Sequence, residues 1–173
     1  MTTDEQTYKD LITAFSHKLT IETSFYWKKA TKRLVEVSVF DYALVSGDKY
    51  GYTSGLDPEE EREVKEAIIA KEKNQDTHLQ IPRLTVPERI EIMNRFIKIQ
   101  TDPNQKALLQ TTLNKIIELQ SNNKELLRKG FKWGFDMDNL IVHTKELSSS
   151  WIEFYRNETR FYVDKWLDEV NAG

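Results

Sequence analysis

The chain has 173 residues, of which 39% are hydrophobic and 31% are charged, and its formal net charge is −3 at pH 7. This length suffices for a hydrophobic core that needs no disulfides or metal ions to hold it, and we expect one domain over residues 1–173. The absence of cysteine excludes disulfides and thiolate chemistry. No apolar run approaches the roughly 20 residues of a membrane span, so we expect a cytoplasmic protein without a membrane segment.

The first predicted element is an amphipathic helix, whose apolar stripe consists of Tyr8, Leu11, Ile12, Phe15 and Leu19. After this helix, the spacing of residues that share a face changes to every second position. Residues 34–41 alternate, with Leu34, Glu36, Ser38 and Phe40 on one face and Val35, Val37, Val39 and Asp41 on the other. This pattern predicts a pair of strands in residues 24–46 that form a hairpin, with its turn near "KATKR".

Two helix starts carry capping boxes. Asp57 precedes Pro58 and is followed by Glu60 three residues later, so a helix is predicted over residues 58–73. That segment has few apolar residues, and we expect it to lie on the surface. Thr85 and Glu88 form the second box. The helix that follows should be central, because its apolar stripe is wide: Val86, Ile90, Ile92, Met93, Phe96 and Ile97.

A leucine-rich helix follows Pro103, and residues 124–142 and 144–170 are predicted to form two further helices. "THLQIP" before Thr85 is a short extended piece. The fold class is therefore α+β: a mostly helical single domain with a small antiparallel sheet or hairpin near the N-terminus.

Aromatic residues are concentrated in "SSSWIEFYRNETRFYVDKWL", residues 148–167. At about 100° per residue, the aromatic side chains from Trp151 to Trp166 fall in an arc of roughly 140°, with Arg156 and Arg160 on the opposite side. This separation favours a buried helix face over a base-stacking surface, with a partner-binding groove as a further alternative. Glu158 and Lys165 fall inside the arc, so they are candidate buried polar groups unless both reach water.

The order of these pieces resembles a bacterial family of uncharacterised proteins, number 0158 in the series of families of unknown function. The segments that carry the resemblance are "SFYWKKATKRLVEV", "HLQIPRLTVPERIEIMNRFI", "KGFKWGF" and "WIEFYRNETRFYVDKWL". Together they cover most of residues 24–167. The resemblance implies no established activity and no catalytic residues.

Two basic clusters are the main functional lead. Lys28, Lys29, Lys32 and Arg33 surround the predicted hairpin turn, and Arg128, Lys129 and Lys132 surround Phe131 and Trp133. If the fold brings the clusters to one face, they form a basic patch that bears aromatic residues on an acidic protein. The alternative is ordinary solvated charge at a turn and on a helix surface.

No motif identifies a reaction. "DMDNLIVHTKEL" begins like a calcium loop but has Ile141 where glycine is needed and Leu147 where a glutamate belongs. His17, His78 and His143 have no metal-ligand spacing. We therefore expect no metal, no cofactor and no enzymatic activity. The favoured hypothesis is an interaction or regulatory protein that binds another protein through its aromatic carboxy-terminal region; the alternative is nucleic-acid or anion binding by the basic clusters.

Overall fold

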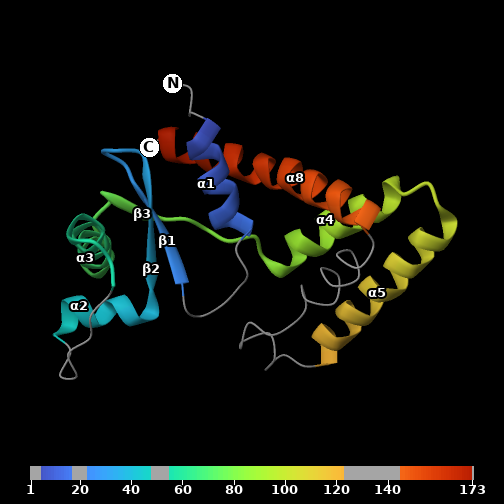
Figure 1. The fold of residues 1–173 in the computed structure, drawn as a ribbon, viewed down its shortest axis with the longest axis horizontal. Helices are drawn as coiled ribbons and strands as arrows, with labels where there is room; N and C mark the ends of the chain where they lie inside the picture. Colours follow the sequence, from blue (N-terminus) through green and yellow to red (C-terminus); the bar gives the residue numbers. More distant parts are fainter. Residues whose placement is uncertain (1–4, 17–22, 48–54, 123–144, 173) are drawn as a thin grey trace. The chain divides into compact units, whose positions relative to one another are not determined.

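The computed structural model describes residues 5–16, 23–47, 55–122 and 145–172 (Figure 1). The chain divides into two compact units. The first unit comprises residues 1–14 and 21–82, and the second comprises residues 15–20 and 83–173. The expectation of one domain over the whole chain stays a prediction. Within the described residues, every helix is too short or too polar to cross a membrane.

The first unit contains a three-stranded antiparallel sheet with the strand order β2-β1-β3. Its strands are β1 (Thr23–Lys28), β2 (Arg33–Ser38) and β3 (His78–Gln80). The predicted hairpin is confirmed, and the turn lies where the sequence placed it. At the turn, Lys32 has a φ of 54° and its N–H donates to the Lys28 carbonyl at 2.8 Å. A lysine therefore occupies a left-handed position that favours glycine.

The predicted alternation is wrong after Ser38. Residues Val39–Tyr42 form a 3-10 helix (η1), and Ala43–Ser46 form a short helix, α2. The cause is a capping box: the Asp41 carboxylate accepts from the Ser38 N–H at 2.7 Å, and the Ser38 hydroxyl accepts from the Phe40 N–H. Asp41 is consequently buried, whereas Phe40 is 63% exposed and Val39 is 46% exposed.

The helix α3 (Pro58–Glu72) begins as predicted. The Asp57 carboxylate accepts from the Glu59 and Glu60 N–H groups, both at 2.9 Å, and the Glu60 carboxylate accepts from the Asp57 N–H. The expectation of a surface helix is wrong for one face. That face packs on the sheet in a shared core of Tyr26, Val35, Val37, Val64, Ala67 and Ile68. Valine and alanine make a narrow stripe, but it suffices because the sheet lies against it (Figure 1).

The second unit is helical and contains α4 (Val86–Ile99), α5 (Pro103–Asn122) and α8 (Lys145–Ala172). The helix α1 (Glu5–Ser16) belongs to the first unit up to Ala14 and ends in the second. Predicted helices after Pro103 and over residues 144–170 are confirmed by α5 and α8. The helix predicted over residues 124–142 lies outside the described residues.

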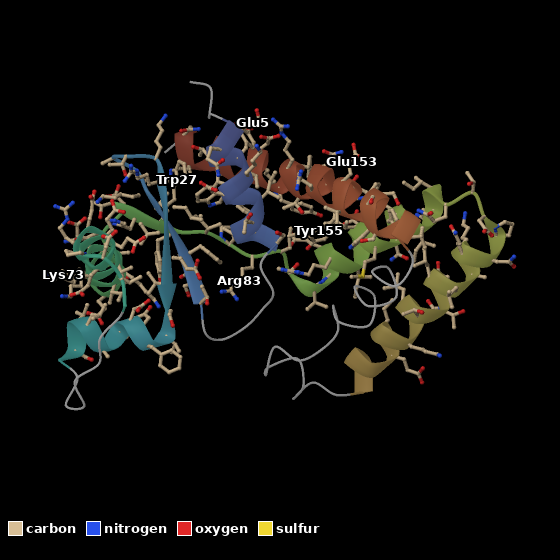
Figure 2. The ribbon with its side chains drawn as sticks, in the orientation of Figure 1. Glu5, Trp27, Lys73, Arg83, Glu153 and Tyr155 are labelled. Atoms are coloured by element: carbon tan, nitrogen blue, oxygen red, sulfur yellow. The ribbon has the colours of Figure 1, made fainter. Side chains whose placement is uncertain are left out.

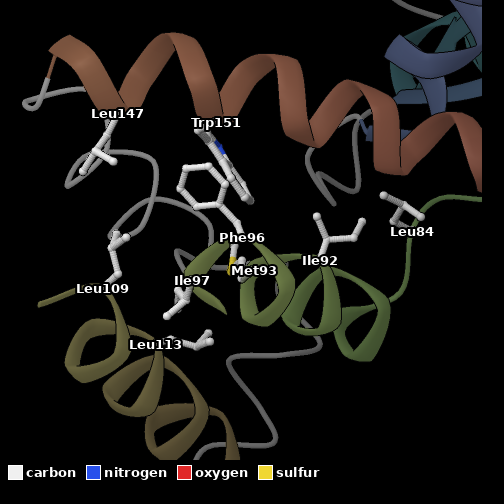
Figure 3. Close-up of a cluster of buried hydrophobic side chains, with 9 residues drawn as sticks. All are labelled: Leu84, Ile92, Met93, Phe96, Ile97, Leu109, Leu113, Leu147 and Trp151. Atoms are coloured by element: carbon white, nitrogen blue, oxygen red, sulfur yellow. The ribbon is translucent and has the colours of Figure 1, made fainter. Parts of the chain in front are cut away.

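The central position predicted for α4 is confirmed. Its capping box is present, with the Glu88 carboxylate accepting from the Thr85 N–H at 2.6 Å and the Thr85 hydroxyl accepting from the Glu88 N–H at 3.5 Å. The core around α4 is drawn in Figure 3, and it combines residues of α4, α5 and α8. Its buried members are Leu84, Ile92, Met93, Phe96, Ile97, Leu109, Leu113, Leu147 and Trp151.

Candidate functional site

The aromatic residues of α8 mostly belong to the core of the second unit. Trp151 is 6% exposed, and its ring lies against that of Phe96, with 5.0 Å between the centroids (Figure 3). The centroid of the Tyr155 ring lies 5.1 Å from that of Trp151. The predicted buried face is therefore confirmed at Trp151. Phe161 differs because it is 65% exposed. It lies at the margin of the arc, roughly 80° from Trp151, which explains why the core does not reach it.

The two polar residues inside the arc have different surroundings. The Glu158 carboxylate pairs with the Arg95 guanidinium of α4 at 2.7 Å, and the Glu158 side chain is 27% exposed. Lys165 is exposed. Both groups thus reach water, and only Glu158 is partly buried, with a counterion beside it.

Two of the four residues of the first basic cluster pair with acidic side chains. The Lys28 ammonium lies 2.8 Å from the Glu66 carboxylate and 3.4 Å from that of Glu63, both on α3. The hydrogen bond with Glu66 raises the pKa of Lys28, and the same bond lowers the pKa of Glu66. Lys29 pairs with Asp76 at 3.3 Å. Acidic residues therefore balance the first two lysines.

The other two members of this cluster, Lys32 and Arg33, are exposed at the turn and at the start of β2. The second cluster, Arg128, Lys129, Lys132 and Trp133, lies outside the described residues. The structure therefore describes only the half of the predicted patch that surrounds the hairpin turn.

The outer edge of β2 is the most distinctive feature of the first unit. Within the described residues, β2 pairs with β1 on one side and with no strand on the other. Successive residues of a strand direct their N–H and C=O groups to opposite sides. The Lys28 carbonyl faces the hairpin partner, because it accepts from Lys32, and the Phe25 carbonyl faces β3, because it accepts from Ile81.

The register then fixes the direction of the β2 backbone. Tyr26 shares the orientation of Lys28 and lies opposite Val35. Val35 therefore directs its backbone groups toward β1, while Leu34 and Glu36 direct theirs to the outer edge. Ser38 has the same outward direction, and its N–H is occupied by the Asp41 carboxylate at 2.7 Å. The edge thus offers the N–H and C=O groups of Leu34 and Glu36 and is closed at Ser38.

This edge lies in a groove of about 860 Å³. Residues 31–36 and Ser38 form its floor, and consecutive positions contribute because the groove follows the backbone edge. One wall comes from α1, through Gln6, Thr7 and Asp10. The other comes from the start of α3 and the residue before its cap, through Leu56, Glu60, Glu63 and Val64. Side chains of the two walls and of the sheet between them are drawn in Figure 2.

The charges of the groove are unequal. Five acidic side chains line it, Asp10, Glu36, Asp41, Glu60 and Glu63, against the two basic side chains of Lys32 and Arg33. Glu63 and Asp41 have internal partners, in Lys28 and the Ser38 N–H. Lys32 and Arg33 lie at the turn, so the rest of the groove is acidic.

A second pocket, of about 640 Å³, lies at the opposite edge of the same sheet and is lined by Lys28, Lys29, Glu66, Ile69 and His78, among others. His78 is 8% exposed, its Nδ1 lies 3.2 Å from the Thr77 hydroxyl, and its buried Nε2 has no hydrogen-bond partner among the described residues. Burial lowers the pKa of His78, and Lys28 lowers it further. The imidazole is therefore neutral at pH 7.

A pair of tyrosines joins α3 to the sheet. The Tyr26 and Tyr42 hydroxyls lie 3.5 Å apart, and the Lys71 ammonium donates to the Tyr42 hydroxyl at 2.7 Å. Burial raises the pKa of Tyr26 to about 12, so the phenol stays protonated. These bonds connect β1, through η1, with α3.

Sequence reasoning missed the groove. The strand itself was predicted, but the strand order that leaves β2 at an edge depends on the pairing of β1 with β3, whose partners are 50 residues or more apart along the chain, as for Lys28 and His78. Glu36 was a usable signal, because a charge in the middle of an apolar strand is typical of an exposed edge.

The described residues contain no group of three or more histidine, aspartate or glutamate side chains that could hold a metal ion. Comparison of the chain with models of protein families, with curated proteins and with solved structures finds no match. The resemblance to the bacterial family 0158 therefore rests on the quoted segments alone.

Proposed function

We propose that this protein is a non-enzymatic interaction module of the cytoplasm that binds an extended segment of another protein along the outer edge of β2. The observation that carries the proposal is the open edge: outward N–H and C=O groups at Leu34 and Glu36 lie in a groove with a helix on each side. Backbone hydrogen bonds from an added strand satisfy such groups, as in other domains that bind peptides by strand addition.

Membership in the bacterial family 0158 is part of this proposal, and the family implies no reaction that competes with a binding role. The aromatic carboxy-terminal region is a weaker candidate for the binding surface. Trp151 is buried in the core. Among the described residues of this region, the exposed aromatic side chain is that of Phe161.

The test is a selection of short random peptides displayed on phage against the wild-type protein, followed by binding measurements with two variants. Leu34→Pro places a ring where the added strand would lie and removes an outward N–H, but it breaks no bond to β1. Leu34→Val keeps the N–H and serves as the matched control. We expect selected peptides to bind wild type and Leu34→Val and to lose binding to Leu34→Pro.

A measurement on the wild-type protein makes this test independent of the stability of the proline variant. Bound peptide should slow the hydrogen exchange of the Leu34 and Glu36 amides, because both acquire acceptors. Peptides that bind without protecting these amides, or a selection that enriches nothing, would refute strand addition at β2.

Nucleic-acid or anion binding is the second candidate. The observation in its favour is the exposure of Lys32 and Arg33 at the hairpin turn. Binding of this kind is electrostatic, so fluorescence anisotropy with short DNA and RNA should show affinity at low salt that falls steeply as salt is added. Absence of binding at low salt would remove this candidate.

A further inference from the structure

We infer that the groove along β2 takes a segment in which lysine or arginine alternates with apolar residues. The inference rests on the proposed function, strand addition at β2, and adds the chemistry of the partner. It follows from the directions of the side chains in β2 and from the charges of the two walls.

Side chains on β2 point alternately to the two faces of the sheet. Val35 and Val37 point to the face that packs on α3. Glu36 therefore points to the other face, away from α3, and α1 supplies the second wall of the groove that Glu36 lines. An added strand alternates in the same way, so every second side chain lies beside Glu36 and the α1 wall, and the others lie toward α3.

The α1 side of the groove favours a cation. Glu36 is exposed, and no lysine or arginine among the described residues pairs with it. Asp10 lies on the same side, and its carboxylate accepts a hydrogen bond from the neutral Gln6 amide at 2.8 Å. In the described part of the chain neither carboxylate forms an ion pair with a lysine or arginine, so both lower the free energy of a cation bound on this side, and they disfavour an acidic segment.

The α3 side of the groove favours an apolar side chain. Leu56 and Val64 line it, and Val64 belongs to the core shared with the sheet. The two carboxylates of this wall already have partners: that of Glu60 accepts from the N–H of the α3 N-cap residue, and that of Glu63 pairs with Lys28. A side chain that extends the apolar surface of Val64 loses contact with water there. Basic residues on one face and apolar residues on the other give the partner segment a period of two.

A second copy of this chain fits the groove less well. Its own β2 is flanked by α1 and α3, and helices of both copies would meet above and below the joined edges. A single extended segment has no such obstacle. The chain also repels itself, since it carries a net charge of −3.

The experiment uses the peptides selected against the wild-type protein. We expect lysine or arginine at alternate positions of the edge-dependent peptides and a depletion of aspartate and glutamate. Binding of a lysine-bearing peptide should weaken by about five- to tenfold in Glu36→Lys and also as salt is added. The matched control is Glu153→Lys, an exposed position on α8 with the same change of charge, where affinity should stay within about twofold.

The outcomes separate the two proposals. Peptides that lose binding in Leu34→Pro but show no basic preference, or bind Glu36→Lys as tightly as wild type, would refute the basic partner and leave strand addition intact. Peptides insensitive to Leu34→Pro would refute both. Dimers of the protein that dissociate in Leu34→Pro, with no basic peptide selected, would identify a second copy as the occupant and overturn the inference.

Discussion

The two units bury their cores in different ways. The second unit closes its core with leucine, isoleucine and methionine around Trp151, which packs on Phe96 and Tyr155. The first unit packs Tyr26 with valine, alanine and isoleucine between a sheet and α3, and the outer edge of its β2 pairs with no other described strand. The comparison shows that a concentration of aromatic residues can mark a core, whereas the candidate binding surface is marked by a strand edge that pairs with no other described strand.

The largest expected effect tests the aromatic half of this comparison. Truncating Trp151 to alanine should lower the free energy of unfolding by about 3 to 5 kcal/mol, because it removes a buried ring and leaves a cavity. Urea denaturation followed by circular dichroism measures the change.

Phe161→Ala is the matched control on the same helix. Its ring is 65% exposed, and the substitution should change the free energy of unfolding by less than about 0.5 kcal/mol. If the two variants proved equally stable, the assignment of the α8 aromatics to the core would fail.

The next largest effects on the free energy of unfolding concern the helix caps, which differ between the two units. The Asp57 carboxylate accepts two N–H bonds of 2.9 Å at the start of α3, whereas the Thr85 hydroxyl accepts one of 3.5 Å at the start of α4. Asp57→Ala should therefore cost about 1.5 kcal/mol, helped by the charge of Asp57 at the positive end of the helix dipole, and Thr85→Ala about 1 kcal/mol or less. Denaturation midpoints that rank the two variants in the opposite order would contradict this reading of the caps.

These caps also show what the sequence could predict. Both capping boxes, the hairpin turn and the buried stripe of α4 depend on residues within a few positions of one another, and all were predicted correctly. The alternation beyond Ser38 was not, because a second local signal, the box of Ser38 and Asp41, stops the strand there. Local chemistry therefore decided both the successes and this error.

Long-range pairing explains the remaining differences. The burial of one face of α3 requires the sheet beside it, and the open edge of β2 requires that β3 join β1 on the far side. The stripe of α3 is narrow and does not show what covers it, and an open edge leaves no signal in the alternation of β2. The candidate groove combines three such segments, so the sequence alone predicted its strand but not the site.

A pH titration tests the buried imidazole of His78 in the first unit. Because burial lowers the pKa of His78 below its ordinary value of 6.5, the unfolded state binds a proton more readily than the folded state. The stability from the neutral imidazole is complete above pH 6.5 and is lost as the pH falls from there through the folded pKa. His78→Gln should remove this part of the pH dependence.

Thermal melting of wild type and His78→Gln between about pH 7.5 and 5.5 makes the comparison, in a range where most carboxylates stay ionised in both proteins. The wild-type melting temperature should fall more steeply than that of the variant. Parallel curves would mean that His78 keeps an ordinary pKa and that its Nε2 reaches water or a partner.

The smallest expected effect concerns the one partly buried carboxylate of the aromatic arc. Glu158 pairs with Arg95 at 2.7 Å, with 27% and 37% of the respective side chains exposed. Solvent at both groups screens the pair, and Arg95 keeps a second acidic partner in Glu91 at 2.9 Å. Glu158→Gln should therefore cost about 0.5 kcal/mol or less at low salt, and high salt should shrink the difference from wild type. A gain in stability would show instead that the cost of desolvating Glu158 exceeds its attraction to Arg95.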